Sequence, residues 1–345
     1  GMATSIPPHN LGEVVDATLH LIDNPEASIA DLMKFVKGPD FPTGGLILGR
    51  SGINDAYKTG RGSIKMRAKV AIEDGVRGQM RIVVTELPYQ ASCSSIAARI
   101  QELVDGGELD GIADVNDNSS GGETNLIITL KRDANSNVVM NNLFKLTTLQ
   151  TSFPVNMVAL VDGVPRTVNL RDALQGYVRH QIDVITRRSN YRLKKAQDRG
   201  HILEGRLKAL NVIDAVIKVI RGSEDGNSAK AALMGKQFGF TERQAIDILD
   251  MQLRQLTRLS RIDLETEQKD VQAQIKELKA ILNDDKKLRS VISKELSAVR
   301  ETFATDRVCK ITADVGEMSV EDLVDNRELV VVMTQAQYVK SVSAD

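Results

Sequence analysis

The residues best suited to chemistry are basic side chains that alternate with apolar ones between positions 63 and 72. A period of two predicts a half-buried strand, so Lys65, Arg67 and Lys69 are expected to share one of its faces. Positions 50–81 contain eight basic and three acidic residues, which gives this segment a net charge of +5. Cations at this spacing can follow a phosphate backbone without reading sequence, although a solvated sheet face explains the charge equally well. The candidate phosphate contacts are Arg61, Lys65, Arg67 and Lys69.

A second basic run lies between positions 187 and 199, and acidic residues recur between 265 and 285. Both segments have helical spacing, and opposite charges on neighbouring helices pair across their seam. Such pairing explains the second basic run at least as well as DNA binding does.

Catalytic groups are scarce in this sequence. The four histidines are scattered, with no second metal ligand four residues away: His9, His20, His180 and His201. Gly60-Arg61-Gly62 lacks the glycine spacing and the Lys-Ser/Thr pair of a phosphate-binding loop. The acidic residues between 114 and 123 stand among Asn, Ser and Gly, which is typical of a turn. We therefore expect neither a self-contained active site nor a metal site.

The composition sets the class of protein. The 345 residues predict two or three domains, and 45 basic against 46 acidic residues exclude a uniformly basic nucleic-acid coat. Aromatic residues make up only 3%, with no Trp, which favours helix–helix seams built from aliphatic side chains. No apolar run approaches the ~18 residues of a membrane span. Cys93 and Cys309 have neither metal-ligand nor disulfide spacing, so we expect a reducing, cytoplasmic setting.

The elements that must position these residues fall into two classes, which together predict an α+β protein. Ile6 precedes Pro7-Pro8, a stiff extended element, and Asn10 then caps a first helix. Strands and helices interleave as far as about position 170. The expected strands lie at 63–72, 79–87, 125–130 and 156–161, and the expected helices at 94–105 and 138–149.

The second half is helical. Apolar residues recur at steps of three and four over 170–221 and again over 271–303, which is coiled-coil spacing. A compact helical segment lies between these runs, at 223–259. Two long helices around such an insert are expected to fold back as an antiparallel hairpin with a knob at its tip. A strand or two follow near 329–340.

Seven short motifs carry a resemblance to a known family. In chain order they are Ile6-Pro-Pro-His-Asn10, Tyr57-Lys-Thr-Gly-Arg-Gly62, Val84-Thr-Glu-Leu-Pro-Tyr89, Val178-Arg-His180, Thr186-Arg-Arg188, Asp198-Arg-Gly-His-Ile-Leu203 and Leu253-Arg-Gln-Leu-Thr-Arg-Leu259. The chain resembles the A subunit of bacterial type IIA DNA topoisomerases, and it is more similar to the DNA gyrase branch than to topoisomerase IV.

The resemblance implies a domain layout and a function. It implies part of a breakage-reunion subunit that bends gate DNA and forms the exit gate during ATP-dependent strand passage and negative supercoiling. The implied layout is a tower domain at 1–169, an outgoing coiled-coil helix at 170–222, a helical C-gate dimerisation knob at 223–260, a returning helix at 261–310, and at 311–345 a return to the tower with the first strand of a truncated C-terminal domain.

The resemblance also implies which groups lie elsewhere. The family cleaves DNA with a tyrosine between Arg and Thr on a winged-helix domain. The tyrosines here all have other neighbours: Tyr57, Tyr89, Tyr177, Tyr191 and Tyr338. We therefore expect a fragment that follows the winged-helix domain, is inactive alone and holds no cofactor, since ATP and Mg²⁺ belong to the partner B subunit.

The implied partners are double-stranded DNA, a second copy of the chain and the B subunit in an A2B2 assembly on the chromosome. Ile6 matches the isoleucine that wedges between base pairs, and a β-branched side chain held by two prolines suits that role. The candidates for the dimer contact, some of which the sequence alone would equally place in an internal core, are Met234, Phe238, Ile246, Leu249, Met251, Leu253 and Leu256. The alternatives are a non-enzymatic coiled-coil scaffold with an α/β head and a topoisomerase IV subunit.

Overall fold

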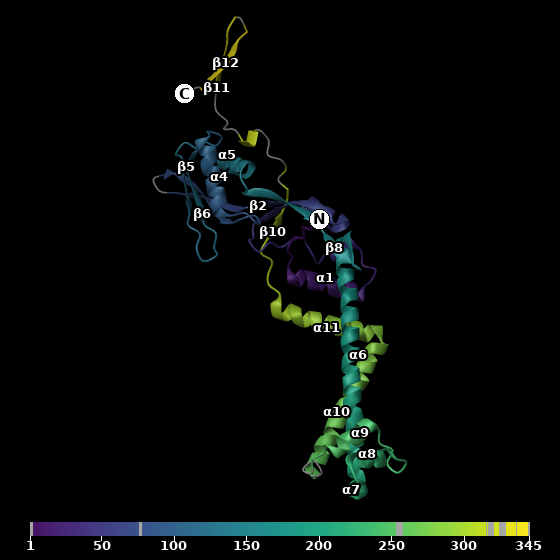
Figure 1. Ribbon diagram of the computed structural model, residues 1–345. Coiled ribbons are helices and arrows are strands. Elements are labelled where there is room, and N and C mark those ends of the chain that lie inside the picture. Colours follow the sequence, from purple (N-terminus) through teal and green to yellow (C-terminus); the bar gives the residue numbers. More distant parts are fainter. Residues whose placement is uncertain are drawn as a thin grey trace. The chain divides into compact units, whose positions relative to one another are not determined.

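The computed structural model describes residues 3–75, 78–252, 258–314, 316, 321–323, 329–335 and 337–343. The chain forms two compact units, Gly1–Gly176 with Val299–Asp345, and Tyr177–Ala298. The first unit combines sheets with helices and the second consists of long and short helices, so the predicted mixed α+β class is confirmed (Figure 1). None of the helices in the described ranges has the length and apolarity needed to span a membrane.

The first unit contains short helices and strands. Its elements are α1 (Leu11–Asp23), α2 (Ile29–Leu32), β1 (Leu46–Leu48), α3 (Ser51–Thr59), β2 (Arg61–Arg67), β3 (Lys69–Asp74), β4 (Met80–Glu86), α4 (Cys93–Asp105), β5 (Ile112–Asp117), β6 (Leu126–Leu130), α5 (Ser136–Leu146), β7 (Gln150–Asn156), β8 (Val158–Val161), β9 (Val164–Thr167), β10 (Lys310–Thr312), the 3-10 turn Glu321–Leu323, β11 (Leu329–Met333) and β12 (Val339–Ser343).

The first sheet has the order β10-β1-β2-β7, with β1 and β10 parallel and the other pairs antiparallel. Alternation along β2 buries Ile64 and Met66 at 2% and 3% exposure, as its sequence predicts. They share one core with α1, α3 and the first turns of α6. The side chains at 61, 63, 65 and 67 lie on the opposite face of the strand.

Two glycines place the start of β2. Gly60 ends α3 in the left-handed region, with φ 76°. A Cβ at Gly62 would lie 2.6 Å from the carbonyl oxygen of Gly52, so the backbones of α3 and β2 meet directly. The Gly60-Arg61-Gly62 motif therefore serves a close packing of helix on strand, and Arg61 is held at its centre.

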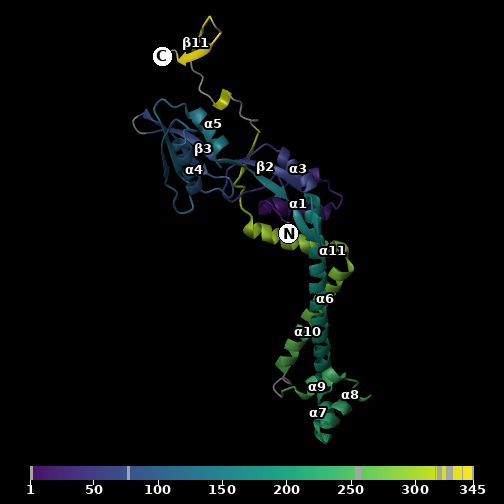
Figure 2. The ribbon, with the colours of Figure 1, turned by 45° about the horizontal axis from the view of Figure 1, so that its top comes forward.

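The second sheet has the order β3-β4-β6-β5, and α4 and α5 pack on it (Figure 2). The prediction of one strand over 63–72 is wrong at its centre. Ala68 is buried at 1% exposure, and its N–H donates to the carbonyl oxygen of Leu149 at 2.7 Å. The chain changes sheets there, because β2 ends at Arg67 and β3 begins at Lys69. Lys69 therefore does not share a strand face with Lys65 and Arg67.

In the second unit, the long helices α6 (Leu170–Asn211, which begins in the first unit), α10 (Arg258–Asn283) and α11 (Asp285–Phe303) pack together. Arg188 pairs with Glu295 and Arg199 with Glu267, so residue numbers rise on α6 as they fall on its partners. The helices thus run in opposite directions, and α6 and α10 lie side by side in both views (Figures 1 and 2). The Arg199–Glu267 pair confirms the expected interhelical charge pairing, whereas Glu295 lies beyond the acidic segment that the sequence predicts to pair.

Both long runs are interrupted. The expected unbroken helix over 170–221 ends at Asn211, since Val212 adopts φ −123° and ψ 32°, outside the helical region. The chain continues as α7 (Ile213–Gly222), α8 (Gly226–Met234) and α9 (Glu242–Leu249), which share a small core with Ala209, Phe238 and Phe240. The returning run breaks between Asn283 and Asp285, where Asp284 Oδ1 accepts the backbone N–H of Lys286 at 2.9 Å.

Candidate nucleic-acid interface

The segment before Ile6 is attached to the edge of the first sheet. The backbones of Ser5 and Asn156 exchange two hydrogen bonds of 2.9 Å each. The hydroxyl of Thr4 donates to the carbonyl oxygen of Asn156 at 3.2 Å, and Asn156 Nδ2 donates to that of Ala3 at 2.9 Å. Residues 3–5 are thereby fixed on the last residue of β7.

The segment after Ile6 is fixed as well. Pro7 and Pro8 restrict the backbone, and the Pro8 carbonyl accepts the N–H of Asp40 at 2.9 Å. His9 Nε2 lies 2.7 Å from the Tyr57 hydroxyl. Between these anchors the side chain of Ile6 is 48% exposed. An apolar, β-branched side chain therefore stands in solvent on a backbone held from both sides, which would suit insertion between base pairs.

A groove of about 670 Å³ lies beside Ile6. Its lining is rich in hydroxyl groups and includes Ser5, Tyr89, Ser95, Thr148, Thr151 and Ser152. Ser, Thr and Tyr hydroxyls are common donors to phosphate and sugar oxygens of DNA. The groove is therefore suited to a nucleic-acid backbone next to the exposed isoleucine.

The four candidate cations differ in their surroundings. Arg61 is exposed, and its guanidinium makes neither an ion pair nor a hydrogen bond to any residue that the structure describes. Lys65 Nζ lies 3.8 Å from Asp314 Oδ2, a loose pair. In register, Arg61 stands opposite Asn156, which pairs in turn with Ser5. Two strand spacings place Arg61 roughly 10 Å from the residue before Ile6.

The other two cations have internal partners. Arg67 Nε donates to Gln150 Oε1 at 2.6 Å, and its guanidinium lies 4.5 Å from the centroid of the Phe144 ring. Burial lowers the pKa of Arg67 from its ordinary value. Lys69 Nζ pairs with Glu86 Oε1 at 2.7 Å. Burial would raise the pKa of Glu86, but hydrogen bonds from Lys69 and the Gly45 N–H together hold it below its usual range. Arg61 and Lys65 are thus better placed for phosphate contacts than these two.

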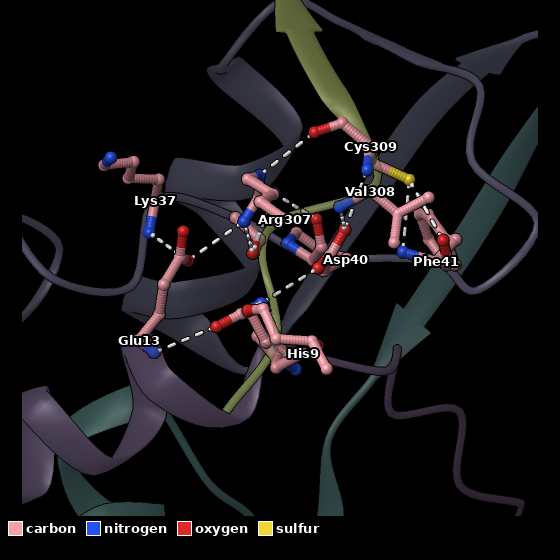
Figure 3. Close-up of polar contacts among 12 residues, drawn as sticks. His9, Glu13, Lys37, Asp40, Phe41, Arg307, Val308 and Cys309 are labelled. Carbon is pink, nitrogen blue, oxygen red and sulfur yellow. Dashed lines mark hydrogen bonds and ion pairs between the residues drawn. The ribbon is translucent and has the colours of Figure 1, made fainter. Parts of the chain in front are cut away.

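A polar cluster around Arg307 lies close to His9, Glu13 and Asp40, and no sequence spacing reveals it (Figure 3). The Arg307 guanidinium donates to Glu13 Oε2 at 2.9 Å, to the carbonyl of Gly38 at 3.1 Å, to the carbonyl of Cys309 at 3.1 Å, and to the carbonyl of Pro39. The guanidinium thus joins α1, the 38–39 turn and the segment that leads into β10.

Asp40 and Asn10 complete the cluster. Asp40 Oδ1 accepts the N–H groups of Val308 at 3.0 Å and Cys309 at 2.8 Å. Asn10 Oδ1 caps α1, while its Nδ2 donates to the carbonyl of Thr305 at 2.9 Å. These bonds connect the Ile6–Asn10 motif to a segment almost 300 positions away.

Two titratable groups in this region have shifted pKa values. Burial is the main cause that lowers the pKa of His9 to about 4, so its imidazole is neutral at pH 7. Burial likewise raises the pKa of the Cys309 thiol to about 11. The Cys309 Sγ donates to the carbonyl of Gly44 at 3.0 Å. Cys309 is therefore a packed thiol rather than a nucleophile.

The dimer candidates separate into surface and core residues. Met234 and Ile246 are exposed at 42% and 44%. Phe238 is 7% exposed and belongs to the core of α7–α9, against which Leu249 packs. Met251 is half-buried. Leu253 and Leu256 lie outside the described residues. Met234 and Ile246 are thus the candidates that remain accessible in a single chain.

The described side chains include no group of three or more His, Cys, Asp or Glu residues that could hold a metal ion. The groove beside Ile6 is lined by hydroxyl and apolar groups rather than by acids and bases. The groove therefore offers hydroxyl donors and apolar surface to a ligand.

Comparison with known proteins gives a consistent result. A family model for the A subunit of DNA gyrase/topoisomerase IV matches residues 1–297. The DNA gyrase A subunit of Clostridium acetobutylicum is 46% identical over 345 residues, which are 100% of this chain and 41% of the relative. That of Staphylococcus epidermidis is 46% identical over 342 residues, 99% of this chain and 38% of the relative. That of Halalkalibacterium halodurans is 46% identical over 340 residues, 99% of this chain and 41% of the relative. The chain thus spans about two fifths of the length of these relatives.

Proposed function

The chain belongs to the A-subunit family of DNA gyrase and topoisomerase IV, and from this premise we propose that it is the part of such a subunit that bends gate DNA and forms the exit gate. Supercoiling by a gyrase is the favoured activity, because the relatives named above are gyrase subunits. Decatenation by a topoisomerase IV is the second candidate within the same family.

One observation carries the DNA-bending proposal. Ile6 is 48% exposed although it is apolar and its backbone is anchored on both sides. Inserting such a side chain between base pairs costs a few kcal/mol of unstacking, which the contacts of the bent duplex offset. The hydroxyl-lined groove supplies neutral donors for those contacts, and Arg61 and Lys65 supply charge.

We assign the exit gate to the helical knob. Met234 and Ile246 present apolar surface on α8 and α9, while the knob has its own core beneath them. Methionine tolerates repacking, which suits a contact that must open and close. In a two-fold assembly the long helices would be stiff arms, with a transported duplex leaving between the knobs.

The remaining parts of the reaction are assigned to other segments and subunits. The DNA-cleaving tyrosine would lie on a winged-helix domain of the complete A subunit, and ATP and Mg²⁺ would be bound by a B subunit in an A2B2 assembly. This chain by itself would bind DNA without cleaving or relaxing it.

The test is DNA bending by the full-length A subunit in its complex, read by energy transfer between fluorophores at the two ends of a gate duplex. Ile6→Ala should reduce bending and supercoiling, because no wedge then holds the base step open. Exposed Leu160 on the β8–β9 hairpin offers a matched control, so Leu160→Ala should leave both unchanged. Unchanged bending by Ile6→Ala would refute the proposal. Supercoiling measured against decatenation distinguishes the two candidate activities.

A further inference from the structure

We propose that Asn156 is a positioning residue for the Ile6 wedge, an inference that rests on the DNA-bending function proposed above. Asn156 is the last residue of β7. It contacts three consecutive residues, Ala3, Thr4 and Ser5, immediately before Ile6. Among the described residues, every hydrogen bond that attaches residues 3–5 to the sheet therefore involves Asn156.

The side chain adds what the backbone alone does not supply. The Ser5–Asn156 pair is an isolated bridge at the edge of the sheet, and the Thr4 hydroxyl adds a bond to the Asn156 carbonyl. Asn156 Nδ2 holds the carbonyl of Ala3 at 2.9 Å, which extends the attachment by one more residue. Together these bonds fix the direction in which the chain leaves Ser5, and Pro7 fixes the direction in which it leaves Ile6.

The register gives Asn156 a second consequence. Arg61 stands opposite Asn156 on β2, so Arg61, Asn156 and Ser5 form one row across the sheet. Because Asn156 is the middle member of that row, it sets the spacing between the exposed Arg61 and the wedge. A duplex that contacted both Arg61 and Ile6 would be bent while these two contacts stayed a fixed distance apart.

The same residue permits a clean test, because its other polar atom is unsatisfied. Asn156 Oδ1 is buried and has no hydrogen-bond partner among the described residues. Replacing Asn156 with Ala removes one hydrogen bond and also one unsatisfied acceptor, and these effects on stability oppose each other. Asn156→Ala should therefore release Ala3 while the first unit stays folded.

The experiment compares variants of the full-length A subunit on the fluorophore-labelled gate duplex. Asn156→Ala should lower the bending signal by at least about half. DNA affinity should change less than about threefold, because the phosphate contacts that supply most of the affinity do not depend on the geometry of the wedge. Asn24→Ala is the matched control. Asn24 Nδ2 also donates to a backbone carbonyl, that of His20 at 3.2 Å, at the far end of α1.

A designed disulfide provides rescue. Residues 5 and 156 form a hydrogen-bonded antiparallel pair, for which Cα atoms lie about 5.5 Å apart, within reach of a disulfide. The double variant Ser5→Cys/Asn156→Cys should bend DNA when oxidised and lose bending when reduced. A purely structural role for Asn156 would not give this redox dependence.

The outcomes separate the two proposals. If Asn156→Ala bends DNA like the unaltered protein while Ile6→Ala does not, Asn156 is no positioning residue and the wedge still stands. If Ile6→Ala bends normally, the proposed function fails. Hydrogen exchange on the 345-residue chain gives an independent measurement, and the Ser5 amide should exchange faster in Asn156→Ala. Unchanged protection of that amide would overturn the inference.

Discussion

The Arg307 cluster leads to a quantitative prediction for the substitution Arg307→Met. Methionine keeps an apolar stem of similar reach but none of the donors. Glu13 then loses its cation, and the carbonyls of Gly38, Pro39 and Cys309 lose a shared donor. The segment 305–309 would keep its hydrogen bonds to Asp40, Asn10 and Gly44, and β10 would keep its pairing with the edge of β1 and the bonds beside it.

The expected loss of stability follows from burial. The Arg307 and Glu13 side chains are only 18% and 15% exposed, so they form a largely desolvated pair. Removing one partner of a buried pair costs about 3–5 kcal/mol, and the residual exposure places this variant near the lower end, about 3 kcal/mol. Arg307→Met/Glu13→Gln should recover part of that loss, because no unpaired carboxylate remains.

The measurement is urea unfolding followed by far-ultraviolet circular dichroism, together with hydrogen exchange at residues 310–312. Arg300→Ala is the matched control, because Arg300 also lies on the returning segment and also pairs with α1, through Asp16. Its side chain is 45% exposed, so solvent screens the pair and the loss should be much smaller. If Arg307→Met and Arg300→Ala cost the same, or if β10 stays protected in Arg307→Met, the cluster does not anchor the returning segment.

Three further predictions concern charge, pH and the knob. In salt titrations of DNA binding, Arg61→Ala should flatten the dependence of affinity on salt by roughly one ion, whereas Arg67→Ala should leave the slope unchanged because Arg67 has internal partners. The folded-state pKa of His9 is about 4 against 6.5 in the unfolded chain, so its contribution to stability is complete above pH 6.5 and is lost as the pH falls toward 4. The unfolding free energy should fall by about 3 kcal/mol over that range, and His9→Asn should remove this component when urea midpoints are compared between pH 7 and about 4.5. Ile246→Lys should shift sedimentation of the chain at micromolar concentration toward monomer with unchanged unfolding, whereas Phe238→Ala should destabilise the knob by about 3–5 kcal/mol, and the reverse pattern would contradict the assignment of surface and core.

Local features of the fold could be predicted because their causes are local. Asn10 accepts the Glu13 N–H as the cap of α1, and the alternation along β2 buries Ile64 and Met66. The change of sheet at Ala68 could not be predicted, because the alternation of basic and apolar residues continues through it. It is fixed instead by a hydrogen bond to Leu149, far along the chain.

The candidate site was predictable in part. Ile6 stands before two prolines in the sequence, and its side chain is exposed. The side chain of Arg61 is exposed as well. The internal partners of Arg67 and Lys69 depend on Gln150 and Glu86, which only the folded sheets bring near. The same holds for Asn156, because a lone asparagine at the end of a strand gives no signal until its pairing with Ser5 is known.

The parallel pairing of β1 with β10 has a consequence for the order in which the chain folds. Residues Leu46–Leu48 can pair with Lys310–Thr312 only after the latter have been synthesised. The whole of Tyr177–Ala298 is synthesised between these two strands. Closing so long a loop is slow, and a growing chain acquires its contacts from the N-terminus onward. The helical unit can therefore complete its own packing while one edge of the first sheet is still unpaired. The Arg307 cluster forms at that last step, so we expect it to lock a nearly finished unit rather than to nucleate it.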